Sequence, residues 1–234
     1  DLTWRYMSWF YECMDQIAVP SSAYLDRLAE KGFAREKLYV MPRGVDPERF
    51  SPDKRDENFW QQFGLGDGFK FLYAGRISKE KNLENLLEAF RSLQSGRDFS
   101  ARLILAGDGP HLEELKKEYA DENIHFTGRL DGESLAKAYA GADFFVFPSL
   151  TDTFGNAVLE AHASGLPAIV SGEGGPCEIV RTHNSGLVVD ARRPAALAEA
   201  LHSVRNNDAL RNQLREGALA RAKASRWETI LAQL

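Results

Sequence analysis

The sequence has few cysteines, and this scarcity narrows the classes to which the chain can belong. Its 234 residues include only Cys13 and Cys177, which lie far apart and lack the spacing of a metal or redox motif. Disulfide frameworks are typical of small secreted domains, whereas unpaired cysteines are typical of a reducing compartment. We therefore expect a cytoplasmic protein.

The sequence also lacks an excess of positive charge, a zinc-binding spacing of histidines and long apolar runs. The formal net charge is −5, from 29 Lys and Arg against 34 Asp and Glu, so no overall positive field attracts nucleic acid. The five histidines follow no zinc-binding pattern, and we expect no metal site. No apolar stretch is long enough to span a bilayer, and no signal peptide is apparent. With these features absent, the sequence is that of an ordinary globular protein.

The beginning of the chain is unusual. Its first residue is Asp1 rather than methionine, and a helical pattern rich in aromatic residues starts at once, across residues 4–11. We expect a fragment of a longer protein. Aromatic side chains separated from their native neighbours would form an apolar patch, so we also expect self-association through residues 4–11.

Glycine and proline divide the first third of the chain into two regions. Residues 1–42 combine helical and strand patterns, and residues 43–68 contain repeated glycine and proline. The second region is predicted to be a linker with one short helix at 57–63. After the aromatic helix, the first region is predicted to hold a strand at 17–20, a helix at 21–31 and a strand at 38–41.

From residue 69 to residue 206, short apolar runs alternate with helical patterns. Such alternation is typical of a parallel sheet covered by helices, so we expect an α/β fold with a Rossmann-like doubly wound sheet. Ligands of such folds bind beyond the carboxyl ends of the strands. Strands are predicted at 70–74, 102–106, 124–127, 143–147, 168–171 and 187–190, with helices at about 82–95, 110–120, 133–141, 155–164, 176–181 and 194–206. Residues 207–234 are predicted to form two further helices.

A pair of carboxylates, Asp152 and Glu160, is the most informative motif. Asp152 follows a predicted strand, and Glu160 lies about one and a half turns into the next helix. Backbone N–H groups at the start of that helix would face a ligand held by the loop. Phosphate near the amides and hydroxyls near the carboxylates would suit a nucleotide sugar. Taken alone, such a pair is more often a solvated acid and a helix-surface glutamate.

The first strand of the regular region ends in a basic turn. Gly75 permits a tight turn, and Arg76 and Lys81 then flank a helix predicted to begin near Asn82. An arginine fork and a lysine point charge together match a diphosphate. A solvated basic turn explains these residues equally well, and Lys79 is predicted to be solvated.

Glycines also follow the second strand, at Gly107 and Gly109. A dinucleotide-binding fingerprint needs a third glycine where this chain has Leu112, so NAD is disfavoured. The two glycines either let the backbone approach a ligand or form a tight turn. Backbone groups at Arg129 and Leu130, after the third strand, are candidates for binding a base edge, although a plain loop fits as well.

A last glycine-rich loop runs from residue 172 to residue 178 and ends in Glu178. This carboxylate is a candidate for binding a sugar or nucleotide hydroxyl. The alternative is a solvated glutamate in the first turn of a helix.

Together these motifs resemble the carboxyl-terminal half of a group-one (family four) retaining GT-B glycosyltransferase. The resemblance covers residues 69–190 nearly continuously and in the order of the family. Residues 1–42 resemble the end of the acceptor-binding domain of the family, and residues 43–68 resemble its interdomain linker. The matching elements are Gly-Arg-x-x-x-x-Lys (75–81), Ala-Gly-Asp-Gly-Pro (106–110), the carboxylates Asp152 and Glu160, Ala-Ser-Gly-Leu-Pro (163–167) and Gly-Gly-Pro-x-Glu (174–178).

The resemblance implies a role for each matching residue. Arg76 and Lys81 would bind the donor diphosphate, Glu160 the ribose and Asp152 the transferred sugar. Members of the family more often carry glutamate where this chain has Asp152, which is shorter by one methylene. With these four as the catalytic set, the expected donor-binding residues are Gly75, Gly107, Gly109, Arg129, Leu130, Phe154, Gly155, Asn156, Glu160 and Glu178.

The implied activity is that of a retaining hexosyltransferase, which moves a sugar from a UDP- or GDP-sugar to a saccharide or lipid acceptor. No cofactor or metal is implied beyond that substrate, and a full-length relative can lie peripherally at the inner face of a membrane. Because most of the acceptor domain would be missing, this chain would bind the donor but not transfer sugar alone. The alternatives are a nucleotide-sugar epimerase or phosphorylase, or a non-catalytic nucleotide- or phosphate-binding module.

Overall fold

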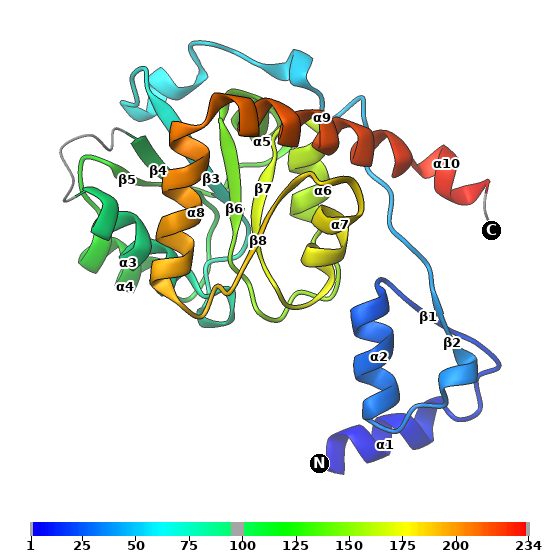
Figure 1. The fold of residues 1–234 in the computed structure, drawn as a ribbon. Coiled ribbons are helices and arrows are strands. Elements are labelled where there is room, and N and C mark those ends of the chain that lie inside the picture. The colour runs from blue at the N-terminus through cyan, green and yellow to red at the C-terminus, as the bar shows by residue number, and fades with distance from the viewer. Residues whose placement is uncertain (1, 95–100, 233–234) are drawn as a thin grey trace.

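The computed structural model describes residues 2–94 and 101–232 as a small amino-terminal unit joined to a larger α/β unit (Figure 1). The larger unit is built on a six-stranded parallel sheet with strand order β5-β4-β3-β6-β7-β8. The chain order reverses between β3 and β6, as in doubly wound folds. The strands are β3 (Phe69–Ala74), β4 (Ala101–Ala106), β5 (Ile124–Gly128), β6 (Phe144–Phe147), β7 (Ala168–Ser171) and β8 (Gly186–Val189).

Helices cover both faces of this sheet. On one side α3 packs against α8, and on the other α5, α6 and α7 are neighbours, with α9 lying across α6 and α7 (Figure 1). The doubly wound α/β prediction is therefore confirmed. These helices are α3 (Leu83–Gln94), α4 (Leu112–Tyr119), α5 (Gly132–Gly141), α6 (Asn156–Ala163), α7 (Gly175–His183), α8 (Pro194–Asn206), α9 (Asp208–Ala224) and α10 (Trp227–Leu231).

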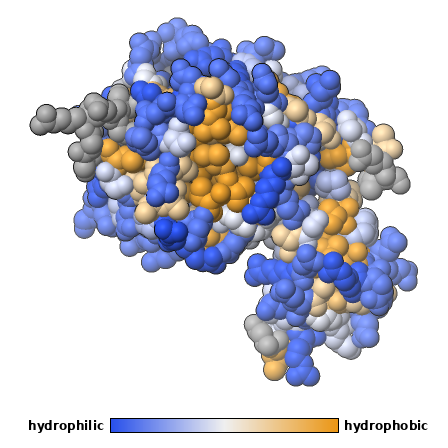
Figure 2. All heavy atoms as spheres, in the orientation of Figure 1, coloured by the Kyte–Doolittle hydropathy of each residue, from blue (hydrophilic) through white to orange (hydrophobic). Residues whose placement is uncertain are grey.

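The inner strands are hydrophobic because helices cover them from both sides. All four residues of β6 and all four of β7 are buried, as expected of strands inside a parallel sheet. The edge strand β8 is only half-buried after its first residue, and Figure 2 shows apolar side chains gathered over it between α7 and α8. All six strands lie within one residue of their predicted positions.

The amino-terminal unit has its own small core. It comprises α1 (Leu2–Tyr11), β1 (Ile17–Val19), α2 (Ser22–Glu30) and β2 (Leu38–Val40), with β1 and β2 paired in parallel. The elements predicted for residues 2–42 are therefore present. Nothing in α1 is buried, and Trp9 and Phe10 remain 68% and 50% exposed. The core consists of Val19, Leu28, Phe33 and Leu38.

The segment between the two units packs onto the larger one. Trp60, in the 3₁₀-helix Phe59–Phe63, is buried and donates its indole N–H to the carbonyl of Gly141 at 2.9 Å. A short helix was predicted there, and the structure has this tighter form, which ends at the left-handed Gly64. Val45 donates its N–H to the carbonyl of Ser225 at 2.8 Å, so the carboxyl-terminal helices also touch the connection.

Within the described ranges 2–94 and 101–232, no helix combines the length and the apolarity needed to cross a lipid bilayer.

Candidate functional site

A cavity of about 610 Å³ lies at the carboxyl edge of the sheet, beside the point where the strand order reverses. Its walls come from the loops after β3, β4 and β5 and from α5 and α6. This is the edge at which doubly wound folds bind their ligands. The lining includes seven of the predicted site residues, namely Gly75, Arg76, Gly107, Gly109, Arg129, Leu130 and Glu160, together with Tyr139 and Ala157.

The glycines of the cavity are required by packing between two loops. A Cβ added to Gly107 would lie 1.8 Å from the carbonyl oxygen of Gly75, and one added to Gly109 would lie 2.2 Å from that of Ile77. The same loops are hydrogen-bonded, since Ile77 donates its N–H to the carbonyl of Asp108 at 2.9 Å. Of the two explanations offered for these glycines, the tight turn therefore has a structural basis, and ligand approach stays a prediction.

Arg76 lies exposed at the mouth of this cavity. Its backbone carbonyl accepts a 2.7 Å hydrogen bond from the hydroxyl of Tyr73 in β3, and this bond holds the turn in place. Burial raises the pKa of Tyr73, so this hydroxyl remains a donor. Among the described residues, no carboxylate forms an ion pair with the guanidinium of Arg76. Its positive charge is therefore available to an anionic ligand.

Lys81 and Asp152 form an ion pair across the switch point. The Lys81 ammonium lies 2.7 Å from the Asp152 carboxylate, with the two side chains 17% and 21% exposed. The same ammonium stands 5.7 Å from the ring centroid of Phe147. The structure thus brings two predicted catalytic residues into direct contact. Neither lines the cavity; Asp152 instead lines a second cavity of about 690 Å³ between its loop and α2.

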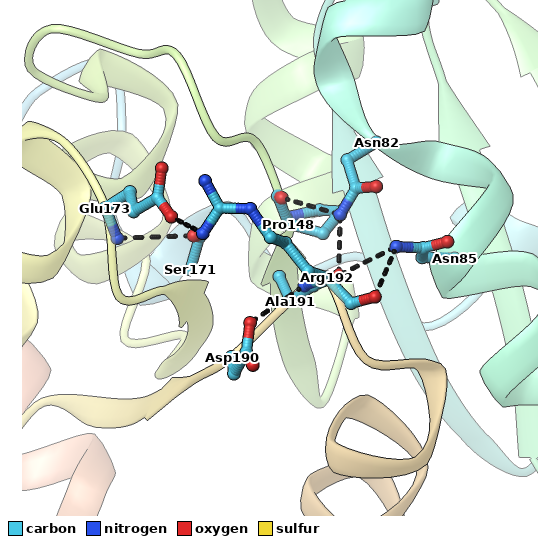
Figure 3. Close-up of polar contacts among 8 residues, drawn as sticks. All are labelled: Asn82, Asn85, Pro148, Ser171, Glu173, Asp190, Ala191 and Arg192. Carbon is cyan, nitrogen blue, oxygen red and sulfur yellow. Dashed lines mark hydrogen bonds and ion pairs between the residues drawn. The ribbon is translucent and has the colours of Figure 1, made fainter.

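Asn82 and Asn85 anchor the loop that carries Lys81 (Figure 3). The Asn82 side-chain amide donates to the carbonyls of Pro148 and Ala191 at 3.3 and 2.7 Å, and that of Asn85 reaches Ala191 at 3.1 Å. Asn82 has a left-handed φ of 57° and separates a 3₁₀ turn from α3. The prediction that a helix begins near Asn82 is confirmed, since α3 starts at the next residue, Leu83. This anchor ties the loop after β3 to the ends of β6 and β8.

Glu160 is held by a buried tyrosine. It lies in the second turn of α6, and its carboxylate accepts a 3.1 Å hydrogen bond from the hydroxyl of Tyr139 in α5. Burial raises the pKa of Glu160, while the hydrogen bond from Tyr139 opposes that rise. The result is a carboxylate fixed at the wall of the cavity. Sequence reasoning missed Tyr139, because a tyrosine on the apolar face of a helix is indistinguishable from a core residue.

The first turn of α6 is open to a ligand. Gly155 precedes the helix with a left-handed φ of 99°, and no side chain caps the helix there. The first N–H groups of a helix have no partner within it and favour anions. Phe154 is buried, whereas Asn156 is exposed at the first helical position. A Cβ on Gly155 would lie 2.9 Å from the ring of Pro176, so glycine is needed for packing as well as for φ.

Glu178 lies away from the cavity. Its two carboxylate oxygens accept the backbone N–H groups of Ser22 and Ala23 at 3.0 and 2.5 Å, at the N-terminus of α2. The structure therefore does not bring Glu178 together with the other predicted donor-binding residues. Binding of a donor hydroxyl by Glu178 stays a prediction. Arg129, in contrast, is at the cavity mouth and highly exposed, 3.9 Å from Asp131.

In the part of the chain that the structure describes, no three side chains of the His, Cys, Asp or Glu type are arranged to hold a metal ion. Both cysteines are free thiols, with Cys13 exposed and Cys177 buried.

Comparison with protein families matches almost the whole chain. Residues 54–221 match the family described as glycosyl transferases group 1, and residues 1–49 match glycosyltransferase family 4. A sulfoquinovosyl transferase of Arabidopsis thaliana is 35% identical over 78% of this chain. A GDP-mannose-dependent alpha-mannosyltransferase of Corynebacterium glutamicum is 31% identical over 99% of it. The chain spans only 36% and 54% of these two relatives.

Solved structures share the fold. Sucrose-phosphate synthase from Thermosynechococcus elongatus superposes with a TM-score of 0.83 and 28% identity, over 100% of this chain and 60% of that one. Anabaena HepE in complex with UDP-glucose superposes with a TM-score of 0.87 and 20% identity, over 99% of this chain and 66% of that one. The parallel sheet of this chain and its flanking helices are those of the GT-B glycosyltransferase fold.

Proposed function

Because the chain belongs to the group 1 glycosyltransferases, we propose that it supplies the donor site of a retaining hexosyltransferase of carbohydrate biosynthesis. The donor is a UDP- or GDP-sugar and the acceptor is a hydroxyl of a saccharide or lipid. One observation supports this most: Arg76 and Glu160 line a single cavity at the switch point of the sheet. A cation for the diphosphate and a carboxylate for the ribose are what a nucleotide donor requires.

Catalysis in this proposal is electrostatic. The bond between the sugar C1 and the phosphate oxygen breaks, and the nucleoside diphosphate leaves with the electron pair. The acceptor oxygen bonds to C1, and its proton passes to the leaving phosphate. Arg76, Lys81 and the uncapped N-terminus of α6 stabilise the negative charge that grows on the diphosphate. These groups are held in place before the reaction, so little reorganisation is needed.

The carboxylates bind hydroxyl groups of the donor. Glu160 accepts hydrogen bonds from the ribose, and Asp152 contacts the transferred sugar. Because the Lys81 ammonium lies 2.7 Å from Asp152, it orients the carboxylate proposed to contact the sugar. The backbone amides of Phe154, Gly155 and Asn156 meet the phosphate and the sugar. Gly75, Gly107, Gly109, Arg129 and Leu130 complete the wall around the nucleotide.

The names of the relatives narrow the first donors to test. Two relatives at 31% and 32% identity are described as GDP-mannose-dependent mannosyltransferases, and HepE was solved with UDP-glucose. We keep both bases in the proposal. No metal is part of the proposal. The free thiols suit the cytoplasm, with a peripheral position at the inner membrane face for a longer protein. Alone, the chain binds donor without transferring sugar.

Calorimetric titration with UDP and with GDP tests the donor site. We expect one diphosphate to bind selectively and Arg76→Ala to weaken that binding by about 1.5–3 kcal/mol, the range for a charge-assisted hydrogen bond. The matched control is Lys79→Ala, which removes an exposed positive charge three residues away and should leave the affinity unchanged.

Three outcomes contradict parts of the proposal. Equal affinity in Arg76→Ala and wild type rejects the role of Arg76. Equal losses of diphosphate affinity in Arg76→Ala and Lys79→Ala would show that the affinity depends on net positive charge and not on a specific contact with Arg76. A wild-type chain that binds neither diphosphate rejects the donor site as formed by this chain.

A further inference from the structure

Short polar contacts join the amino-terminal unit to the larger unit at the N-terminus of α2. Glu178 accepts the N–H of Ser22 at 3.0 Å with one carboxylate oxygen and that of Ala23 at 2.5 Å with the other. Beside them, the hydroxyl of Ser21 donates to the carbonyl of Thr153 at 2.5 Å. In Figure 1 this end of α2 faces the larger unit. We name this set of five residues the α2 contact.

The α2 contact has a clear physical basis. The first N–H groups of a helix lack partners within the helix, and they carry the positive end of the helix dipole. A carboxylate that accepts two of them forms charge-assisted hydrogen bonds and satisfies both donors. Both oxygens of Glu178 are engaged in this way at the N-terminus of α2.

The α2 contact reaches the proposed sugar-binding loop. Thr153 directly follows Asp152, and the carbonyl of Asp152 accepts the N–H of Gly175 at 3.1 Å. A Cβ on Gly174 would lie 2.2 Å from that same carbonyl, so the two loops are in close contact. Glu178 belongs to α7, which begins at Gly175. The N-terminus of α2 is therefore seated on the two loops that position Asp152.

We propose that Glu178 is a positioning residue that captures the N-terminus of α2 when the two units close together. Ser21 then holds Thr153, and through it the Asp152 carboxylate, at the donor sugar. The capture is independent of the reaction, whereas the effect on the sugar rests on the proposed function. The α2 contact thus couples closure of the two units to the geometry of the donor loop.

Two variants weaken the contact from opposite sides. Glu178→Gln removes the negative charge. Ser22→Pro removes one N–H donor and leaves Glu178 intact. Ser22 is the first residue of α2, where proline is well tolerated, and Ser21 before it has the extended φ and ψ of −154° and 158° that proline requires. Glu199→Gln, on the exposed face of α8, is the matched control for loss of one charge.

Small-angle X-ray scattering of the unliganded chain, extrapolated to zero protein concentration so that association through α1 does not contribute, tests the capture. We expect wild type and Glu199→Gln to share one compact profile. Glu178→Gln and Ser22→Pro should both give a larger radius of gyration, while their circular dichroism stays that of wild type. Profiles of both variants that coincide with wild type would overturn the capture.

Paired titrations with UDP-glucose against UDP, and with GDP-mannose against GDP, test the positioning. Both variants should lose about tenfold in affinity for the nucleotide sugar, the scale of one charge-assisted hydrogen bond, and should keep their affinity for the diphosphate. A residue that only stabilised the fold would weaken both ligands together.

The outcomes separate the two proposals. If Glu178→Gln weakens sugar binding and Ser22→Pro does not, Glu178 contacts the donor itself and the positioning role is rejected. If the scattering changes but the preference for nucleotide sugar over diphosphate does not, the positioning role is again rejected. If wild type binds no nucleotide, the proposed function fails, while scattering still decides whether Glu178 captures α2.

Discussion

Glu160 depends on Tyr139 for both its position and its charge. The tyrosine hydroxyl donates to the carboxylate at 3.1 Å, and this bond opposes the rise in the pKa of Glu160 that burial causes. An ionised carboxylate accepts hydrogen bonds on both oxygens, whereas protonation turns one oxygen into a donor and so weakens the binding proposed for the ribose hydroxyls. Donor affinity should therefore fall as the pH falls through the raised pKa of Glu160.

Replacement of Tyr139 by phenylalanine should shift this pH dependence. Without the hydrogen bond the pKa of Glu160 rises further, so the loss of donor affinity in Tyr139→Phe should begin at a higher pH than in wild type. Well above both pKa values the affinity of neither protein should change further with pH, and any difference that remains there reflects the lost positioning of Glu160. The measurement is calorimetry with the preferred diphosphate from about pH 5 to pH 8. Tyr119→Phe, in α4 away from the cavity, is the control, and an unshifted profile in Tyr139→Phe would reject the coupling.

At this scale the sequence singled out charged residues, whose roles stay predictions, but not the residues that support them. Arg76, Glu160 and Asp152 stand out because a charge next to a turn glycine or a strand end departs from a plain structural pattern. Tyr139 and Asn82 give no such signal, because their roles depend on hydrogen bonds to Glu160 and to the carbonyl of Ala191, 21 and 109 residues away in the chain. Such long-range partners follow only from the folded structure.

At the scale of elements, the loops after β3 and β4 pack closely enough to exclude side chains. A methyl group on Gly107 would meet the carbonyl oxygen of Gly75 at 1.8 Å, and that carbonyl belongs to a turn tied to β4 by a 3.0 Å hydrogen bond from the Gly75 N–H to Ala106. Neither strand can move without breaking the sheet. Gly107→Ala should therefore destabilise the fold by about 1–3 kcal/mol, as overpacking does.

Urea denaturation measures this cost. Gly66→Ala is the matched control, since a Cβ there has no neighbour within 4 Å, and its midpoint should stay close to that of wild type. Equal midpoints for Gly107→Ala and Gly66→Ala would show that the two loops can separate without cost.

The strands were predictable from the sequence, whereas the fine structure of the turns was not. Apolar runs such as β6 and β7 must be buried on both faces, and this requirement alone places them in an inner parallel sheet. The turn at Asn82 depends on a left-handed residue held by carbonyls of two other strand ends. Composition does not encode that geometry, so the sequence placed the start of α3 near Asn82 but did not predict the left-handed turn before it.

At the scale of the whole molecule, the two units differ in how completely they are covered. The larger unit buries its sheet between helices, while α1 of the small unit leaves four large apolar side chains on its surface. Leu2, Tyr6, Trp9 and Phe10 are 84%, 59%, 68% and 50% exposed, and the rings of Tyr6 and Phe10 stack with centroids 6.3 Å apart. The aromatic helix was predicted from the sequence. The structure adds that no residue of α1 is buried.

We therefore expect copies of this chain to associate through α1, because association removes exposed apolar surface from water. Sedimentation velocity should show a sedimentation coefficient that rises with concentration in wild type. Trp9→Glu places a charge at the centre of the patch and should keep the chain monomeric. Leu219→Glu, at a site in α9 that is 40% exposed, is the control and should associate like wild type. A wild-type chain that stays monomeric at every concentration, or an equal effect of both substitutions, would show that α1 is not the contact surface.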